Sequence, residues 1–356
     1  MNKEIKIENH VISENSPTYI VAEMSANHNL DFNRAKEKIK AAKESGADAI
    51  KIQTYTPDTI TIDSDMPAFR TKGIWEGRTL YELYGKAYTP WEWQRDLRDY
   101  ARELEIDFFS SPFDLTAVDF LEDLEVPAYK IASFEINDIP LIKKIAKLGK
   151  PIIISTGIAY LEDIDLAIRT CKKEKNENVI LLKCISAYPA PYENMNLKVI
   201  PNMAATFDCI CGLSDHSMGS EIAVCAVGLG AKVIEKHFTI RRADGGEDSK
   251  FSMEPHEFEK MVNEIRNVEK ALGKVTYELN EAQMDSRIFS RSLFVVEDIK
   301  AGELFTSENV RSIRPGIGMH TKYWDDVLGK KARCDVKKGT PMDWKYLEYN
   351  KTIGGV

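Results

Sequence analysis

Short apolar runs rich in β-branched residues alternate with amphipathic segments from residue 18 to residue 273. Eight such runs occur, and each is followed by a stretch with apolar residues at helical spacing. The runs cover residues 18–25, 49–55, 107–113, 128–133, 151–157, 179–186, 209–216 and 233–240. Eight strand–helix units in about 250–270 residues are typical of a closed (β/α)8 barrel. The pattern therefore predicts an α/β fold with a TIM barrel.

A doubly wound open sheet has the same local pattern and is the competing architecture. The number of units favours the barrel, as does the absence of a G-x-G-x-x-G turn after the first run. Nearly every run also ends on polar or charged side chains. These are Glu23, Lys51 and Gln53, Ser111, Lys130 and Ser133, Ser155, Ser186, Asp215 and His216, and Glu235 and His237. Because the carboxyl ends of barrel strands meet at one mouth, we expect these side chains to share a pocket.

The character of the sequence changes after Gly273. Residues 274–289 are polar and without periodicity, which predicts a linker. Residues 290–356 contain short apolar runs separated by turn signals, which predicts a small β domain. The expected organisation is a catalytic barrel over residues 1–273, the linker, and that second domain.

Composition excludes several classes of partner. The formal net charge of −8 provides no basic field for nucleic acid. No apolar run reaches the roughly 18–20 residues of a membrane span, and the first residues lack the apolar core of a secretory signal. We therefore expect a cytoplasmic enzyme that binds neither nucleic acid nor a membrane.

Two histidines end the seventh and eighth predicted strands, which are neighbours in a barrel. His216 and His237 could therefore face each other and bind a divalent metal, with Glu23 on the adjacent first strand as a carboxylate neighbour. The alternative is two unrelated histidines, each with its own local hydrogen bond. Mn²⁺, Mg²⁺, Co²⁺ and Zn²⁺ all suit such donors to some degree.

Two lysines and two serines form a second candidate group. Lys51, Lys130, Ser133 and Ser155 end the second, fourth and fifth predicted strands. Ammonium and hydroxyl groups that converge at a barrel mouth can bind a phosphate or a carboxylate. A Schiff-base lysine is a second interpretation, and pairing of each lysine with a buried acid is a third. Two buried lysines are costly without an anion, which favours anion binding.

One arginine of the second domain, Arg314, lies between an extended run and a Pro–Gly turn. Turn residues are exposed by default, so a solvated arginine and a ligand-binding arginine remain equal alternatives on this evidence.

Several segments of the chain together resemble the sialic acid synthase family. They are AEMSANHN, GADAIKIQTYTPDT, FFSSPFD, AYKIASFE, ISTG, GLSDHS, VIEKHFT and RSLFVVEDIKAGE followed by RSIRPG. They occur in order, and the resemblance extends from Tyr19 to Tyr346. AEMSANHN departs from the AEIGxNHxG form of N-acetylneuraminate synthases and, with QTYTPDT, LYELYGKAYTPWEW and SSPFDLTAVDFLE, is similar to pseudaminic acid synthases.

The resemblance implies a barrel with a C-terminal antifreeze-like (SAF) β-clip domain, in a domain-swapped homodimer where that domain caps the partner's barrel. It implies condensation of phosphoenolpyruvate with an open-chain N-acetylated amino sugar, releasing phosphate and requiring a divalent metal, often Mn²⁺. For a pseudaminic acid synthase the acceptor is 2,4-diacetamido-2,4,6-trideoxy-L-altrose. N-acetylneuraminate and legionaminic acid synthases are the alternatives within the family.

The resemblance also assigns residue roles. His216 and His237 correspond to the metal ligands. The phosphoenolpyruvate contacts correspond to Lys51, Ser111, Lys130, Ser133, Ser155, Ser186 and Ser214. The sugar contacts correspond to Glu23, Gln53, Tyr188, Asp248 and, from the partner chain, Arg314.

Catalysis is assigned to Lys51 and Lys130, with Glu23 as the first candidate for proton transfer and Glu135 as the second. The family uses no Schiff base. A class I pyruvate aldolase acting through Lys130, and a carbohydrate-binding protein without catalysis, are therefore the remote alternatives.

Overall fold

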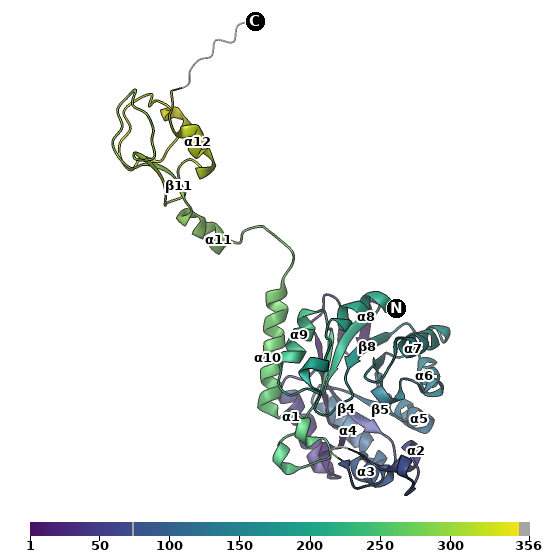
Figure 1. The fold of residues 1–356 in the computed structure, drawn as a ribbon. Helices are drawn as coiled ribbons and strands as arrows, with labels where there is room; N and C mark the ends of the chain where they lie inside the picture. Colours follow the sequence, from purple (N-terminus) through teal and green to yellow (C-terminus); the bar gives the residue numbers. More distant parts are fainter. Residues whose placement is uncertain (73–74, 349–356) are drawn as a thin grey trace. The chain divides into compact units, whose positions relative to one another are not determined.

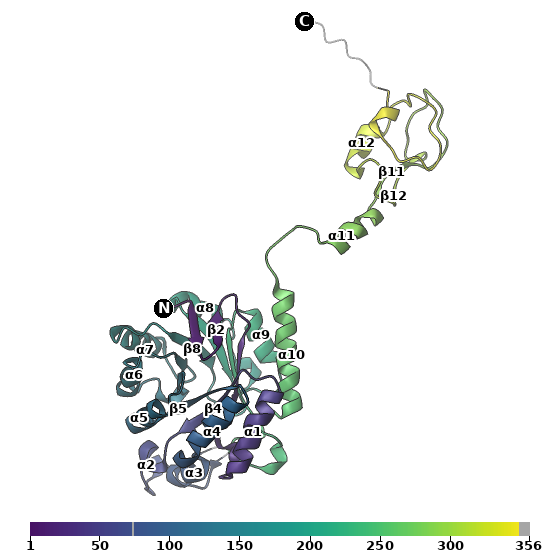
Figure 2. The ribbon, with the colours of Figure 1, turned by 180° about the vertical axis from the view of Figure 1, so that it is seen from behind.

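The computed structural model describes residues 1–72 and 75–348, and it divides the chain into two compact units at Gly273 and Lys274 (Figures 1 and 2). The first unit contains a closed barrel of eight parallel strands in the order β10-β3-β4-β5-β6-β7-β8-β9. The strands are β3 (Tyr19–Glu23), β4 (Ala49–Thr54), β5 (Asp107–Pro112), β6 (Tyr129–Ile131), β7 (Ile152–Ser155), β8 (Val179–Cys184), β9 (Ile210–Asp215) and β10 (Val233–His237). The predicted barrel is confirmed, and each strand lies within its predicted run.

A long helix follows each strand and covers the outside of the barrel (Figure 2). These helices are α1 (Phe32–Glu44), α4 (Trp91–Glu103), α5 (Leu115–Asp123), α6 (Ile139–Ala146), α7 (Leu161–Lys173), α8 (Val199–Phe207), α9 (Glu221–Gly228) and α10 (Pro255–Leu272). The first is typical: Asp31 caps it by accepting from the backbone N–H of Arg34. Its buried residues Ala35, Ile39 and Ala42 recur at helical spacing and join the core between strands and helices.

A hairpin that the sequence analysis missed packs against the barrel interior. It consists of β1 (Glu4–Ile7) and β2 (His10–Ser13). Its apolar residues Ile5, Ile7 and Ile12 belong to one buried cluster with inward side chains from the starts of the strands, such as Tyr19 and Val233. The hairpin therefore closes the amino-terminal end of the barrel, opposite the predicted mouth.

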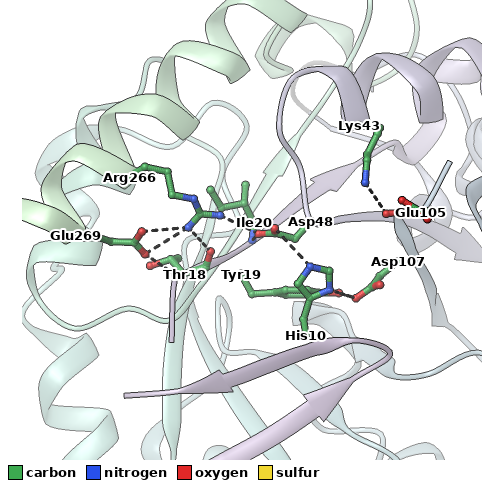
Figure 3. A network of polar contacts seen from close by, with 10 residues as sticks. All are labelled: His10, Thr18, Tyr19, Ile20, Lys43, Asp48, Glu105, Asp107, Arg266 and Glu269. Carbon is green, nitrogen blue, oxygen red and sulfur yellow. Dashed lines mark hydrogen bonds and ion pairs between the residues drawn. The ribbon is translucent and has the colours of Figure 1, made fainter. Parts of the chain in front are cut away.

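Polar contacts fasten that closed end (Figure 3). Asp107 accepts hydrogen bonds from the Tyr19 hydroxyl at 2.7 Å and from the His10 Nδ1 at 2.8 Å, which ties β2 to β3 and β5. Arg266 of α10 reaches Asp48 at 3.1 Å and donates to the backbone carbonyl of Thr18 at 2.7 Å. These contacts hold the amino-terminal end shut, so access to the interior lies at the carboxyl ends of the strands.

The second unit begins at Lys274 and has its own buried core, which includes Leu293, Val295, Phe305 and Val310. It contains the antiparallel pair β11 (Ser292–Val295) and β12 (Val310–Ile313) and the short helix α12 (Trp324–Val327). The end of the predicted β domain, residues 349–356, lies outside the described residues. Within the described ranges, no helix has both the length and the apolar character that a membrane span requires.

The predicted linker is not wholly irregular. Helix α11 (Glu281–Ser286) forms within it because Asn280 caps the helix and the Gln283 side chain accepts a hydrogen bond from the backbone N–H of Asn280. This helix buries no residue, so its sequence lacks the apolar periodicity that indicates the other helices. It was therefore missed.

Candidate active site

The strand residues that point into the barrel change from apolar to polar along each strand. Alternate residues of a strand face the same side, so the inward position after Val21 is Glu23, and the one after Phe109 is Ser111. In the same way Ile153 is followed by Ser155, Ala128 by Lys130 and Val233 by Glu235. The apolar layers fill the interior, and the polar layer above them forms the floor of the mouth.

This floor opens into a cavity of about 610 Å³, a size that suits a small-molecule site. All but two of the predicted site residues line it. They are Glu23, Lys51, Gln53, Lys130, Ser133, Glu135, Ser155, Ser186, Tyr188, Ser214, His216, His237 and Asp248. The cavity also unites the two groups that the sequence analysis treated separately, the lysines and the histidines.

Two buried lysines share a carboxylate that had no predicted role. The Oε1 of Glu235 lies 3.8 Å from the Nζ of Lys51 and 3.9 Å from the Nζ of Lys130. Lys51 also pairs with Glu23 at 2.5 Å. Burial by itself lowers the pKa of Lys51, but the two carboxylates outweigh burial and raise that pKa, so the ammonium form is favoured. For Lys130 burial prevails over the attraction of Glu235 and lowers the pKa.

Hydroxyl groups surround Lys130 on the neighbouring strands. Its ammonium donates to the Ser155 hydroxyl at 2.7 Å, and the Ser186 hydroxyl donates to that of Ser133 at 2.8 Å. Gly157 makes room for the second pair, because a Cβ there would lie 2.4 Å from the Ser186 oxygen and 2.6 Å from the Ser133 oxygen. Ammonium and hydroxyl donors gathered on one side of a cavity can bind a phosphate or carboxylate.

Two predicted site residues do not line the cavity. Ser111 is fully buried in β5, and its hydroxyl accepts a hydrogen bond from Lys51 at 3.3 Å. It therefore helps to position the Lys51 side chain without lining the cavity itself. Arg314 is exposed and belongs to the second unit, where it follows β12 and has no ion pair within the described residues.

The two histidines lie side by side, with ring centroids 5.3 Å apart. The Nδ1 of His216 donates to the carbonyl of Ile185 at 2.8 Å, so Nε2 is the nitrogen through which this ring would bind a metal. The Nδ1 of His237 is buried and has no hydrogen-bond partner among the described residues. Burial lowers the pKa of His237 well below its usual value and keeps the imidazole neutral, as a metal ligand must be.

The donor set therefore fits a metal held by two imidazoles. Residues 1–72 and 75–348 contain no group of three or more His, Cys, Asp or Glu side chains arranged for a metal ion. Glu23, the expected carboxylate neighbour, is engaged with Lys51 instead. The remaining ligands of a bound ion would come from water or substrate.

The acids of the cavity differ in their surroundings. Burial raises the pKa of Glu135 to about 7, and its Oε2 has no hydrogen-bond partner among the described residues. Glu23 also has a pKa raised by burial, but Lys51 opposes the shift and Gln53 donates to it at 3.2 Å. Glu135 is therefore the acid that is most free to exchange a proton near neutral pH.

An insertion between β4 and α4 lines the outer part of the cavity. It contains α2 (Pro57–Ile60) and α3 (Leu80–Ala87). The Arg78 guanidinium donates to both carboxylate oxygens of Glu247, at 2.6 and 3.0 Å, and the Trp75 indole donates to the Glu247 carbonyl at 3.2 Å. The insertion is thereby joined to the loop that follows β10.

The insertion also brings Arg70 and Lys72 to the cavity lining. The sequence analysis did not assign these cations to the site. The sequence of the insertion is rich in Tyr, Trp and Gly but has no periodicity. It therefore did not indicate that this segment lies over the mouth.

Comparisons with known proteins agree with this geometry. Residues 38–277 match the NeuB family, and residues 290–348 match the SAF domain. A pseudaminic acid synthase from Campylobacter jejuni is 49% identical over 325 residues, covering 91% of this chain and 95% of the relative. An N,N'-diacetyllegionaminic acid synthase from the same species is 37% identical over 325 residues, covering 90% and 97%. The crystal structure of an N-acetylneuraminic acid synthetase from Leptospira borgpetersenii in complex with citrate has a TM-score of 0.72 and 33% identity, covering 80% of this chain and 95% of that one.

The fold and the mouth of the barrel define a (β/α)8-barrel enzyme. The chain belongs to the NeuB family, and its C-terminal part is a SAF domain. The family resemblance inferred from the sequence motifs is thus confirmed.

Proposed function

We propose that this enzyme is a pseudaminic acid synthase that works in the cytoplasm. It condenses phosphoenolpyruvate with 2,4-diacetamido-2,4,6-trideoxy-L-altrose and water, giving pseudaminic acid and phosphate. The observation that carries the proposal is the higher identity to the pseudaminic acid synthase (49%) than to the N,N'-diacetyllegionaminic acid synthase (37%), over equal lengths. The cavity supports it, since anion-binding groups and a metal-binding pair face the same space.

Phosphoenolpyruvate binds, in this proposal, on the floor of the barrel. Lys51 and Lys130 face its phosphate and carboxylate, and the hydroxyls of Ser133, Ser155 and Ser186 donate to the same oxygens. Before the substrate binds, Glu235 balances the two ammonium groups. The bound anion then also neutralises the two ammonium groups. Charge interactions are strong in such a buried site.

His216 and His237 hold a divalent metal, for which Mn²⁺ is our first choice. The metal supplies Lewis-acid polarisation of the sugar aldehyde. The pair also orients the acceptor, because the Tyr188 ring lies tilted against His216, with centroids 4.3 Å apart, and limits where the sugar can lie.

The bond-forming step joins C3 of phosphoenolpyruvate to C1 of the aldehyde. Water adds at C2, and the resulting tetrahedral centre expels phosphate to leave the 2-keto acid. The aldehyde oxygen must gain a proton, and the attacking water must lose one. We assign the first transfer to Glu135, because its pKa of about 7 lets it carry a proton at neutral pH. Glu23 becomes the second candidate, which reverses the order expected from the sequence.

Arg314 completes the site from the partner chain of a domain-swapped homodimer. The support is its exposed position after β12 in a SAF domain and the family resemblance. A guanidinium in that place would donate to the sugar acceptor and help to exclude water from the mouth.

A panel of acceptors with phosphate release as the readout tests the proposal. We expect kcat/KM for the 6-deoxy diacetamido-L-altrose to exceed that for N-acetylmannosamine by about 10²-fold or more. The manno-configured 2,4-diacetamido sugar is the second comparison, because it tests stereochemistry alone. Equal kcat/KM for all three sugars would refute the assignment within the family.

A further inference from the structure

The cavity has a polar floor and an apolar wall that come from different parts of the chain. The floor consists of strand residues, whereas the wall consists of side chains from the insertion together with one residue after β5. We call Leu80, Leu83 and Ala87 of α3, with Ile60 and Phe113, the α3 wall. These five side chains can receive a methyl group and carry no hydrogen-bonding atom, although Arg70, Thr71 and Lys72 of the same insertion also line the cavity.

The rings of Tyr55 and Tyr84 brace this wall. Tyr55 contacts Tyr84 edge to face, with centroids 5.6 Å apart, and contacts Phe113 in the same way at 5.1 Å. Leu83 and Ala87 are each 8% exposed. Because both also line the cavity, the exposed part of each side chain is available to a ligand.

Part of the backbone at the two ends of α3 is already engaged in hydrogen bonds. Its first turn is closed by a capping box, in which Thr79 accepts from the backbone N–H of Glu82 and the Glu82 side chain accepts from that of Thr79. At the other end, the N–H of Tyr88 donates to the carbonyl of Tyr84. A sugar hydroxyl placed against the Leu80, Leu83 and Ala87 side chains would find no partner on those side chains, and leaving it unpaired there would be unfavourable.

The direction of the acceptor follows from the reacting groups. Its C1 must meet phosphoenolpyruvate on the floor, near the lysines and histidines. We take the opposite end of the open chain, which carries C6, to extend away from the floor and toward the insertion, whose residues line the cavity. The part of the acceptor that the α3 wall meets is the C6 end.

We propose that Leu80, Leu83 and Ala87 select the acceptor by receiving the C6 methyl of a 6-deoxy sugar and rejecting a C6 hydroxyl. The inference rests on the proposed function and deepens it, since it names the residues that distinguish 6-deoxy from 6-hydroxy acceptors. An apolar pocket discriminates against an added hydroxyl by about 10²-fold.

Two acceptors that differ only at C6 test this directly. They are 2,4-diacetamido-2,4,6-trideoxy-L-altrose and its 6-hydroxy analogue, with phosphate release measured for the full-length, metal-loaded enzyme. The wild type should prefer the 6-deoxy sugar by about 10²-fold in kcat/KM. In Leu80→Gln that preference should fall about tenfold or more, because the amide can pair with the hydroxyl and no longer suits the methyl.

Ala87→Ser is the second variant, because it adds one hydroxyl to the wall and removes no volume. Its preference should also fall, by about threefold or more. Lys86→Gln is the matched control: Lys86 is exposed on the same helix and does not line this cavity, so the wild-type preference should persist. The KM for phosphoenolpyruvate should stay unchanged in all three.

The outcomes separate the inference from the function on which it rests. If the wild type releases phosphate with neither sugar, the proposed function fails, and the inference fails with it. If the wild type uses both sugars equally well, the function stands and the inference alone is overturned. An unchanged preference in both wall variants, with normal turnover of the 6-deoxy sugar, also overturns the inference.

Discussion

Replacing Glu135 with glutamine should reduce turnover and, at alkaline pH, stabilise the protein. Burial raises the pKa of this carboxyl from 4.5 to about 7. The difference corresponds to about 3 kcal/mol that the folded protein loses when it must hold the ionised form. Since the folded-state pKa is the higher one, this loss is absent well below pH 4.5, grows as the pH rises toward 7, and is complete above 7.

Glutamine cannot ionise, so Glu135→Gln should escape that loss. Urea unfolding should show the variant to be more stable than the wild type by up to about 3 kcal/mol at pH 8.5, and by much less at pH 5. The kcat of the variant should fall by about 10²–10⁴-fold, and the decline of the wild-type kcat above pH 7 should disappear. Glu259→Gln, on an exposed position of α10, should change neither quantity.

Two results would contradict this reasoning. If Glu135→Gln has the kcat of the wild type and the same decline of kcat at alkaline pH, Glu135 does not transfer the proton. If the stability of Glu135→Gln relative to the wild type does not increase between pH 5 and pH 8.5, the Glu135 carboxyl is not buried in its neutral form. The two measurements are independent, so the catalytic and the electrostatic arguments are tested separately.

Further predictions concern the metal, the anion site and the dimer. Chelation should abolish activity and Mn²⁺ should restore it, but not in His216→Ala or His237→Ala; normal turnover in either variant would refute that ligand. Lys130→Ala should raise the KM for phosphoenolpyruvate at least tenfold with the fold intact, and unchanged KM and kcat would exclude the predicted contact. Gly157→Ala should also raise that KM by about tenfold, because the added Cβ turns two serine hydroxyls away; circular dichroism should match the wild type. Mixing inactive Arg314→Ala and His237→Ala chains should restore activity in exchanged heterodimers, where one site contains neither change. If heterodimers form and stay inactive, each chain caps its own barrel.

Local patterns in the sequence were sufficient for the barrel and its mouth. Eight apolar runs at strand length, each followed by a helical repeat, determine the strand–helix units without knowledge of distant contacts. Closure of the barrel then brings the carboxyl ends of all strands together, so residues such as Lys51, Lys130 and His237 had to share one space. The motif resemblance identified the family for the same reason, since motifs are contiguous in sequence.

Contacts between distant segments were decided only by the tertiary structure. Glu235 ends a predicted strand like several other residues, and its position between the two lysines depends on how β4, β6 and β10 surround the interior. Ser111 ends an apolar run like the other site residues, but its hydroxyl contacts Lys51 and does not line the cavity. The order of the two glutamates depends on burial and ion pairing, which a sequence does not display.

The hairpin over residues 4–13 and the α3 wall were not foreseen for a related reason. Each is a short segment whose apolar residues find their partners more than a dozen residues away, so neither has the repeated local pattern that reveals a strand–helix unit. Periodicity in the sequence shows which face of a helix or strand is buried in the repeated strand–helix pattern. The position of an insertion over the mouth of a barrel depends on the free energy of packing between elements that are distant in the sequence. The end of the substrate that the insertion meets depends on the same packing. Both are therefore visible only in the three-dimensional structure.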